Sequence, residues 1–139
     1  MTNKTPNVSI LEEVADWLEA GAKHTVDHPI NFDMRYFYRN TDCGSVACIA
    51  GAIVQFNNGV DLDTLELSGI LLEAKSVANL TDEESNYLFA PADDPEQLED
   101  YGVCHEDIDS QWAARTIRHF VSTGIVDWVE TAEINLEHV

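Results

Sequence analysis

Apolar side chains recur at intervals of three and four residues in several segments of the chain. The clearest are 10–20, 65–78 and 108–121, where the spacing places the apolar side chains on one face of an α-helix. A further segment, 44–55, is apolar on nearly all sides, which is typical of a helix buried in the core. We therefore expect a mainly α protein: a compact single-domain helical fold of about 4–6 helices.

Polar caps and glycines predict where the helices begin and end. Capping-box pairs, in which a serine or threonine precedes a glutamate by three residues, begin the first helix and a short helix through Leu88. These pairs are Ser9 with Glu12 and Thr81 with Glu84. Asp107 or Asp109 can cap the last long helix. Gly21 and Gly124 are predicted to end the first and last long helices.

Two stretches lack a helical period. Residues 27–42 are expected to form a loop that covers the core and contains a short helical turn, since Pro29 biases the residue before it away from helix. Residues 125–129 alternate between apolar and polar positions, which favours either one short β element near the C-terminus or a tail packed by Trp128.

The chain length predicts a single domain. With 139 residues, of which 45% are apolar, the chain can build one core. We expect a flexible N-terminus over 1–8, a single helical domain over 9–129 and an acidic C-terminal tail over 130–139. No segment approaches the ~18 consecutive apolar residues that a membrane span needs, and residues 1–10 do not resemble a signal peptide.

The charge is the most unusual property of the composition. The chain has 26 acidic residues against seven basic ones, which gives a formal net charge of −19. Nucleic acid and anionic membrane surfaces are therefore not expected as direct partners, because both carry the same sign of charge. A basic protein is the expected partner, since opposite charges steer association over a Debye length of about 8–10 Å.

The acidic residues are concentrated between Ser76 and Ala114, where the sequence has no lysine or arginine. Three aromatic residues lie among the charges and could anchor an interface; they are Tyr87, Phe89 and Tyr101. The predicted partner-binding residues are Asp82, Glu83, Glu84, Tyr87, Asp93, Asp94, Glu96, Glu99, Asp100, Tyr101, Glu106, Asp107 and Asp109. The alternative interpretation is a solvated face that keeps the protein soluble, or adaptation to a saline habitat, with which the chain's three lysines agree.

Cys43 is the candidate for nucleophilic catalysis. Its expected place at the N-terminus of the helix over 44–55 would stabilise a thiolate. The base would be one of the histidines that lie elsewhere in the sequence, namely His24, His28, His105 or His119. The alternative is a cysteine that serves as a small apolar side chain at a tight helix contact.

A zinc site is chemically conceivable but poorly supported. Cys43, Cys48, Cys104 and His105 would supply three sulfurs and one nitrogen. The spacing of the first two cysteines differs from the knuckles of structural zinc sites, so neither a metal nor a cofactor is predicted. An odd number of cysteines also fits reduced thiols in a cytoplasm better than a disulfide framework.

Three short motifs resemble a known group of proteins. They are Cys43-Gly44-Ser45-Val46-Ala47-Cys48-Ile49-Ala50-Gly51, the acidic stretch Leu80 to Phe89, and Thr123-Gly124 with Val126-Asp127-Trp128. Together they are similar to small, mostly uncharacterised proteins encoded by bacteriophages and some bacteria, over roughly residues 32–128. The resemblance implies a phage or prophage setting and a mainly helical fold, and it brings no activity or catalytic residue with it.

These observations favour a non-enzymatic phage accessory protein of the bacterial cytoplasm. It would bind and inhibit a basic, nucleic-acid-binding host protein, as an anti-CRISPR or anti-restriction protein does, with its carboxylates imitating the phosphates of DNA. The alternatives are a small cysteine hydrolase or thiol enzyme that uses Cys43, and a metal-binding structural protein.

Overall fold

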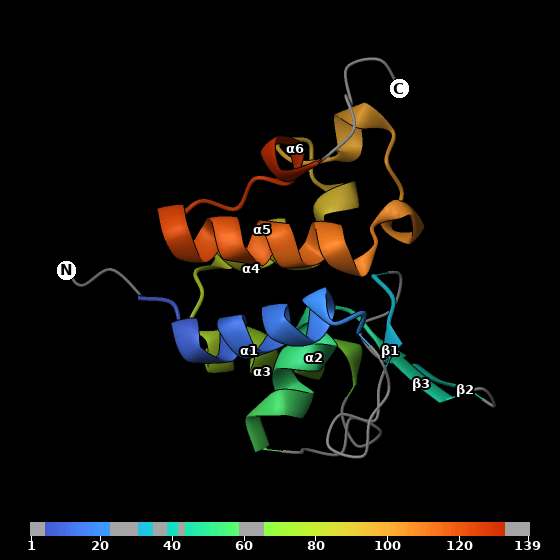
Figure 1. Ribbon diagram of the computed structural model, residues 1–139, viewed down its shortest axis with the longest axis vertical. Helices are drawn as coiled ribbons and strands as arrows, with labels where there is room; N and C mark the ends of the chain where they lie inside the picture. Colours follow the sequence, from blue (N-terminus) through green and yellow to red (C-terminus); the bar gives the residue numbers. More distant parts are fainter. Residues whose placement is uncertain (1–4, 23–30, 35–38, 42–43, 59–65, 133–139) are drawn as a thin grey trace.

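The computed structural model describes residues 5–22, 31–34, 39–41, 44–58 and 66–132 (Figure 1). The described part of the chain is mainly helical, as the apolar spacing predicts. Its α-helices are α1 Val8–Glu19, α2 Ile49–Asn58, α3 Leu67–Ala78, α4 Asp82–Phe89, α5 Ser110–Thr123 and α6 Trp128–Thr131. Short 3-10 helices η2 Pro91–Asp93, η3 Glu99–Tyr101 and η4 His105–Asp107 connect α4 to α5.

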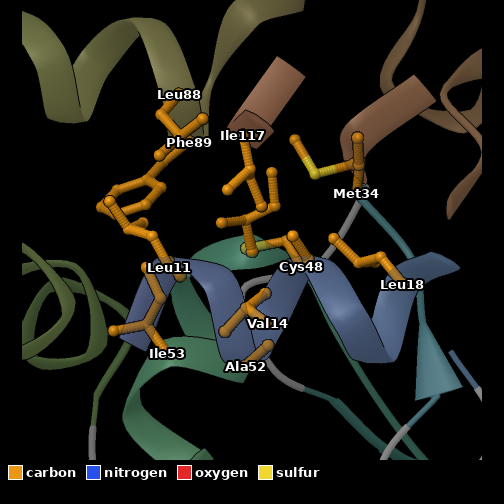
Figure 2. Close-up of a cluster of buried hydrophobic side chains, with 14 of the residues drawn as sticks. Leu11, Val14, Leu18, Met34, Cys48, Ala52, Ile53, Leu88, Phe89 and Ile117 are labelled. Carbon is orange, nitrogen blue, oxygen red and sulfur yellow. The ribbon is translucent and has the colours of Figure 1, made fainter. Parts of the chain in front are cut away.

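Helix α1 lies at the centre of the packing. It contacts α5 on one side and α2 on the other, while α2 packs in turn against α3 (Figure 1). Its apolar stripe is fully buried at Leu11, Val14 and Leu18. Figure 2 shows these side chains in one buried cluster with Ile53 of α2 and Ile117 of α5. One continuous apolar core therefore joins the N-terminal helix to the C-terminal half of the chain.

A small sheet adjoins the helices and corrects one sequence prediction. Strand β3, Gly44–Ala47, pairs in parallel with β1, Asn31–Phe32, and antiparallel with β2, Arg39–Thr41. The expected helix from Gly44 is therefore wrong over its first turn, and α2 begins at Ile49. A run that is apolar on all sides fits a buried strand as well as a buried helix, so its period could not separate the two.

The residues before β3 were expected to form a loop with a helical turn. Residues 31–32 and 39–41 instead form the two outer strands of the sheet. The rest of that expected loop falls partly outside the described residues.

Two of the predicted caps are confirmed. Thr81 Oγ1 accepts a hydrogen bond from the Glu84 amide at 3.1 Å, and Glu84 Oε1 accepts one from the Thr81 amide at 2.9 Å. Of the two candidates for α5, Asp109 is the cap, because its carboxylate accepts from the Trp112 amide at 2.8 Å. Gly124 ends α5 with a left-handed φ of 79°.

The predicted cap of α1 is wrong. The helix begins one residue before Ser9, and Asn7 caps it through a 3.4 Å hydrogen bond that its Oδ1 accepts from the Ile10 amide. Asn7 also donates from its side chain to the Val77 carbonyl at 3.1 Å and from its backbone to the Ala78 carbonyl at 2.8 Å. These contacts with the end of α3 hold Asn7 in the capping position. A capping box is a local pattern, so it could not predict a cap that depends on a residue 70 positions away.

A buried network of hydrogen bonds holds the segment before α6. Gln97 Nε2 donates to the Val126 carbonyl, and the Trp128 amide donates to Gln97 Oε1, both at 2.9 Å. Trp128 Nε1 donates to the Tyr87 carbonyl at 2.8 Å, and Trp112 Nε1 donates to the Trp128 carbonyl at 3.0 Å. We call this network of Tyr87, Gln97, Trp112, Val126 and Trp128 the Trp128 clasp.

The Trp128 clasp decides between the two predictions for residues 125–129. Trp128 is completely buried and its ring meets that of Trp112 edge to face, with centroids 6.0 Å apart. Residues 125–127 have no regular structure and α6 follows them. Residues 125–129 therefore form the tail packed by Trp128, and the prediction of a short strand there is wrong. None of the helices in the described ranges is long and apolar enough to cross a membrane.

Replacing Gln97 by leucine tests the clasp. The change leaves the Val126 carbonyl and the Trp128 amide buried without partners, and each such group costs about 1–3 kcal/mol. We expect the free energy of unfolding to fall by roughly 2–4 kcal/mol, measured by urea denaturation followed by tryptophan fluorescence. Gln55→Leu, at a partly exposed position of α2, is the control, and its loss should stay below about 1 kcal/mol. Equal losses in the two variants would contradict the role given to Gln97.

Candidate acidic interaction surface

The predicted partner-binding residues lie on a folded part of the chain. They lie in α4, in the 3-10 helices η2 to η4 with the turn between η2 and η3, and at the residue that caps α5; we call residues 82–109 the acidic segment. The segment turns its apolar side chains inward, since Leu88, Phe89, Leu98, Val103 and Ile108 are buried. In Figure 1 it runs from α4, behind α5, to the gold and orange turns on the right. The charges therefore sit on an ordered scaffold with its own anchors in the core.

Most carboxylates of the acidic segment are exposed to solvent. The exposed ones are Asp82, Glu83, Asp93, Glu96, Glu99, Asp100, Glu106, Asp107 and Asp109, whereas Glu84 and Asp94 are partly buried. Lys75 pairs with Asp82 and so neutralises one charge of the segment. The exposed carboxylates together create a negative field that extends over roughly 8–10 Å in physiological salt.

Several of these carboxylates also hold the turns together. Asp94 Oδ1 accepts from the Glu96 amide and Asp107 Oδ2 from the Cys104 amide, both at 2.9 Å. Glu84 and Asp109 cap helices in the same way. A carboxylate has about four acceptor positions, so one backbone hydrogen bond fixes its orientation and leaves others for a partner.

The aromatic residues of the segment differ in their availability. Tyr87 is partly buried and its hydroxyl donates to Glu96, which ties α4 to the residues after η2. This hydrogen bond raises the pKa of Tyr87, with burial and neighbouring carboxylates adding to the effect. Tyr101 packs against the core with part of its surface outside. Phe89 is buried at 2% exposure, so its interpretation as an interface anchor is wrong.

Negative charge also gathers on α1. Glu12, Glu13, Asp16 and Glu19 are exposed along its outer face. Arg118 of α5 lies beside two of them, donating to Glu19 Oε1 at 2.7 Å and to Asp16. These two partners raise the pKa of Arg118 well above its usual range, with Glu19 contributing most. Negative charge is therefore not confined to the acidic segment, although Arg118 neutralises part of the charge on α1.

The structure places two of the three cysteines in very different environments. Cys48 is completely buried, and burial raises the pKa of its thiol to about 11. Cys104 is exposed at the start of η4. Cys43, His24 and His28 lie outside the described residues. The helix whose dipole was expected to activate Cys43 begins at Ile49 and β3 intervenes, so that argument for a nucleophile no longer holds.

His105 has a structural contact on this surface. His105 Nε2 accepts a hydrogen bond from the Ala92 amide at 3.2 Å, which joins η4 to η2. Across the described ranges, no three His, Cys, Asp or Glu side chains are grouped so that they could hold a metal ion. The alternative zinc set includes Cys43, which lies outside the described residues.

One feature of this surface was missed from the sequence. The first turn of α4 and the residues after α5 line an open groove of about 550 Å³. We call it the Ile125 groove; its lining residues are Thr81, Asp82, Glu83, Glu84, Tyr87, Gly124, Ile125 and Val126. A large apolar residue directly after the glycine that ends α5 was a weak signal for it, since Ile125 belongs to no helical stripe.

His105 should make stability depend on pH. Burial lowers its pKa from the ordinary 6.5, against a smaller opposing effect of Asp93. The unfolded chain therefore binds a proton at higher pH than the folded one, and stability falls as the pH drops below about 6.5. His105→Gln keeps an acceptor for the Ala92 amide but does not titrate. Between pH 7 and pH 5 the urea midpoint of the wild type should fall relative to this variant; parallel curves would contradict the assignment.

Thiol labelling should separate the two described cysteines. Under native conditions iodoacetamide should alkylate Cys104 and leave Cys48 unmodified until the protein is unfolded, because Cys48 is buried and protonated. Mass spectrometry of chymotryptic peptides reads out each site, with Cys104→Ser as the control. Labelling of Cys48 at the rate of Cys104 would show that the core is open at α2.

Protein-family models, curated proteins and solved structures gave no match. The resemblance to phage-encoded proteins therefore stays a prediction from the motifs.

Proposed function

We propose that this protein binds a basic, nucleic-acid-binding protein of a bacterial host and blocks its nucleic-acid channel. The observation that carries the proposal is the acidic segment itself: exposed carboxylates on a scaffold whose apolar side chains are buried in the core. Duplex DNA presents about one negative charge per 1.7 Å of its axis. A fixed array of carboxylates can occupy the same cationic channel and exclude the nucleic acid.

The order of the scaffold supports this proposal energetically. A charged tail without structure would lose conformational entropy when it docked, which weakens binding. Here the Trp128 clasp, the capping box of α4 and the hydrogen bond from Tyr87 to Glu96 already fix much of the segment. Much of the ordering thus precedes binding, so that less of the electrostatic attraction is offset by lost conformational entropy.

The setting of this activity follows from the motifs rather than from the fold. The similarity to bacteriophage proteins favours an anti-defence role in the bacterial cytoplasm, with a CRISPR effector or a restriction system as the class of target. Such enzymes bind nucleic acid through basic surfaces, so an anionic protein is a suitable inhibitor.

The test begins with affinity capture from a bacterial host lysate at low salt. We expect basic nucleic-acid-binding proteins to be retained and to elute between about 50 and 200 mM added salt, because screening weakens the attraction. Each recovered protein is then mixed with labelled DNA or RNA, and displacement of the nucleic acid by this protein is followed by fluorescence anisotropy. Recovery of no such protein would contradict the proposal.

Matched charge variants show whether the acidic segment is responsible. One variant combines Asp93→Asn, Glu99→Gln and Asp100→Asn; the control combines Glu12→Gln, Glu13→Gln and Glu73→Gln. Both lose the same net charge, and all six positions are exposed. We expect the first variant to displace nucleic acid about tenfold less well, and the control to change by about twofold or less. Equal effects would assign the binding to net charge instead of this surface.

A further inference from the structure

The Ile125 groove combines an apolar side chain with negative charge. Ile125 is 58% exposed, and the described residues include few other large apolar side chains that are so open to solvent. It lines the same open groove as the first turn of α4, which contributes Asp82, Glu83 and Glu84. An exposed apolar side chain is unremarkable alone, but its position in a hollow allows it to be covered by a single inserted segment.

The three carboxylates that line this groove differ in whether they already have a partner. Asp82 pairs with Lys75, and Glu84 is engaged in the capping box. Glu83 is exposed and forms no ion pair with the residues that the structure describes. The groove therefore lacks a cation at Glu83, which a partner can supply.

The lining residues select the chemistry of an occupant. Glu83 favours a cation, and a guanidinium matches a carboxylate with two parallel donors. Tyr87 also lines the groove, and an aromatic side chain there favours a guanidinium as neighbour, while its hydroxyl is already bonded to Glu96. Ile125 favours an apolar neighbour beside that cation, because covering it removes apolar surface from water.

We propose that the Ile125 groove is the docking site for a basic segment of the partner in which an arginine adjoins a large apolar side chain. The arginine pairs with Glu83 and its apolar neighbour covers Ile125. This rests on the proposed function, for which it supplies an anchor at one end of the acidic segment. The rest of the segment contributes long-range attraction, whereas the groove adds shape and apolar contact.

The test uses the full chain labelled with ¹⁵N and a short acetylated, amidated peptide, Gly-Arg-Leu-Arg-Gly. Chemical shifts are followed during titration at low salt, with Gly-Arg-Ser-Arg-Gly as the control peptide. We expect the shift changes of the first peptide to concentrate at 81–87 and 124–126. The serine peptide should bind more weakly by about fivefold, since it cannot cover Ile125.

Paired variants separate the groove from general charge. Ile125→Ser and Glu83→Gln should each weaken binding of the leucine peptide about fivefold or more. Leu72→Ser and Glu13→Gln remove an exposed leucine and an exposed charge elsewhere, and binding should stay within about twofold. Binding that is spread over residues 93–109, or that ignores the groove variants, would overturn the inference.

Two further results would overturn the proposed docking site. Absence of any peptide binding would overturn the docking site while leaving the displacement of nucleic acid, measured separately, to judge the proposed function. Self-association that Ile125→Ser abolishes, seen as a concentration-dependent sedimentation coefficient, would show that a second copy of the chain occupies the groove instead.

Discussion

Gln97 is a buried amide whose donor and acceptor are both used by the backbone of another segment, at Val126 and Trp128. A buried amide without partners costs several kcal/mol, so this side chain is stable only where both backbone groups face it. Trp128 extends the constraint through its indole to the Tyr87 carbonyl, and Trp112 returns to the Trp128 carbonyl. The acidic segment, α5 and the chain before α6 are thereby locked together.

This arrangement explains how a strongly negative surface can be ordered. Like charges repel one another, and the pair of Lys75 with Asp82 offsets only part of that repulsion. Its short 3-10 helices are stabilised instead by buried apolar anchors, by carboxylates that accept from local amides, and by the Trp128 clasp. The same carboxylates that favour a basic partner thus help to fold the surface on which they lie.

Local patterns predicted the helices well and the tertiary contacts poorly. The capping box at Thr81 and the glycine stop at Gly124 follow from neighbours in sequence, so they could be predicted. The cap at Asn7 depends on α3, and the strand at Gly44–Ala47 depends on pairing with two other strands. The acidic segment was visible as composition, whereas the Ile125 groove joins residues about forty positions apart and left little trace in the sequence.

Amide hydrogen exchange of the native protein tests most directly whether the acidic segment is held as a rigid surface. If it is, the amides of Leu98 and Trp128 should exchange through the same global opening as those in the middle of α5, since one network secures all three regions. Exchange of residues 91–107 at the rate of an unfolded chain, while α5 remains protected, would contradict the account. The carboxylates would then lie on a segment that opens by itself.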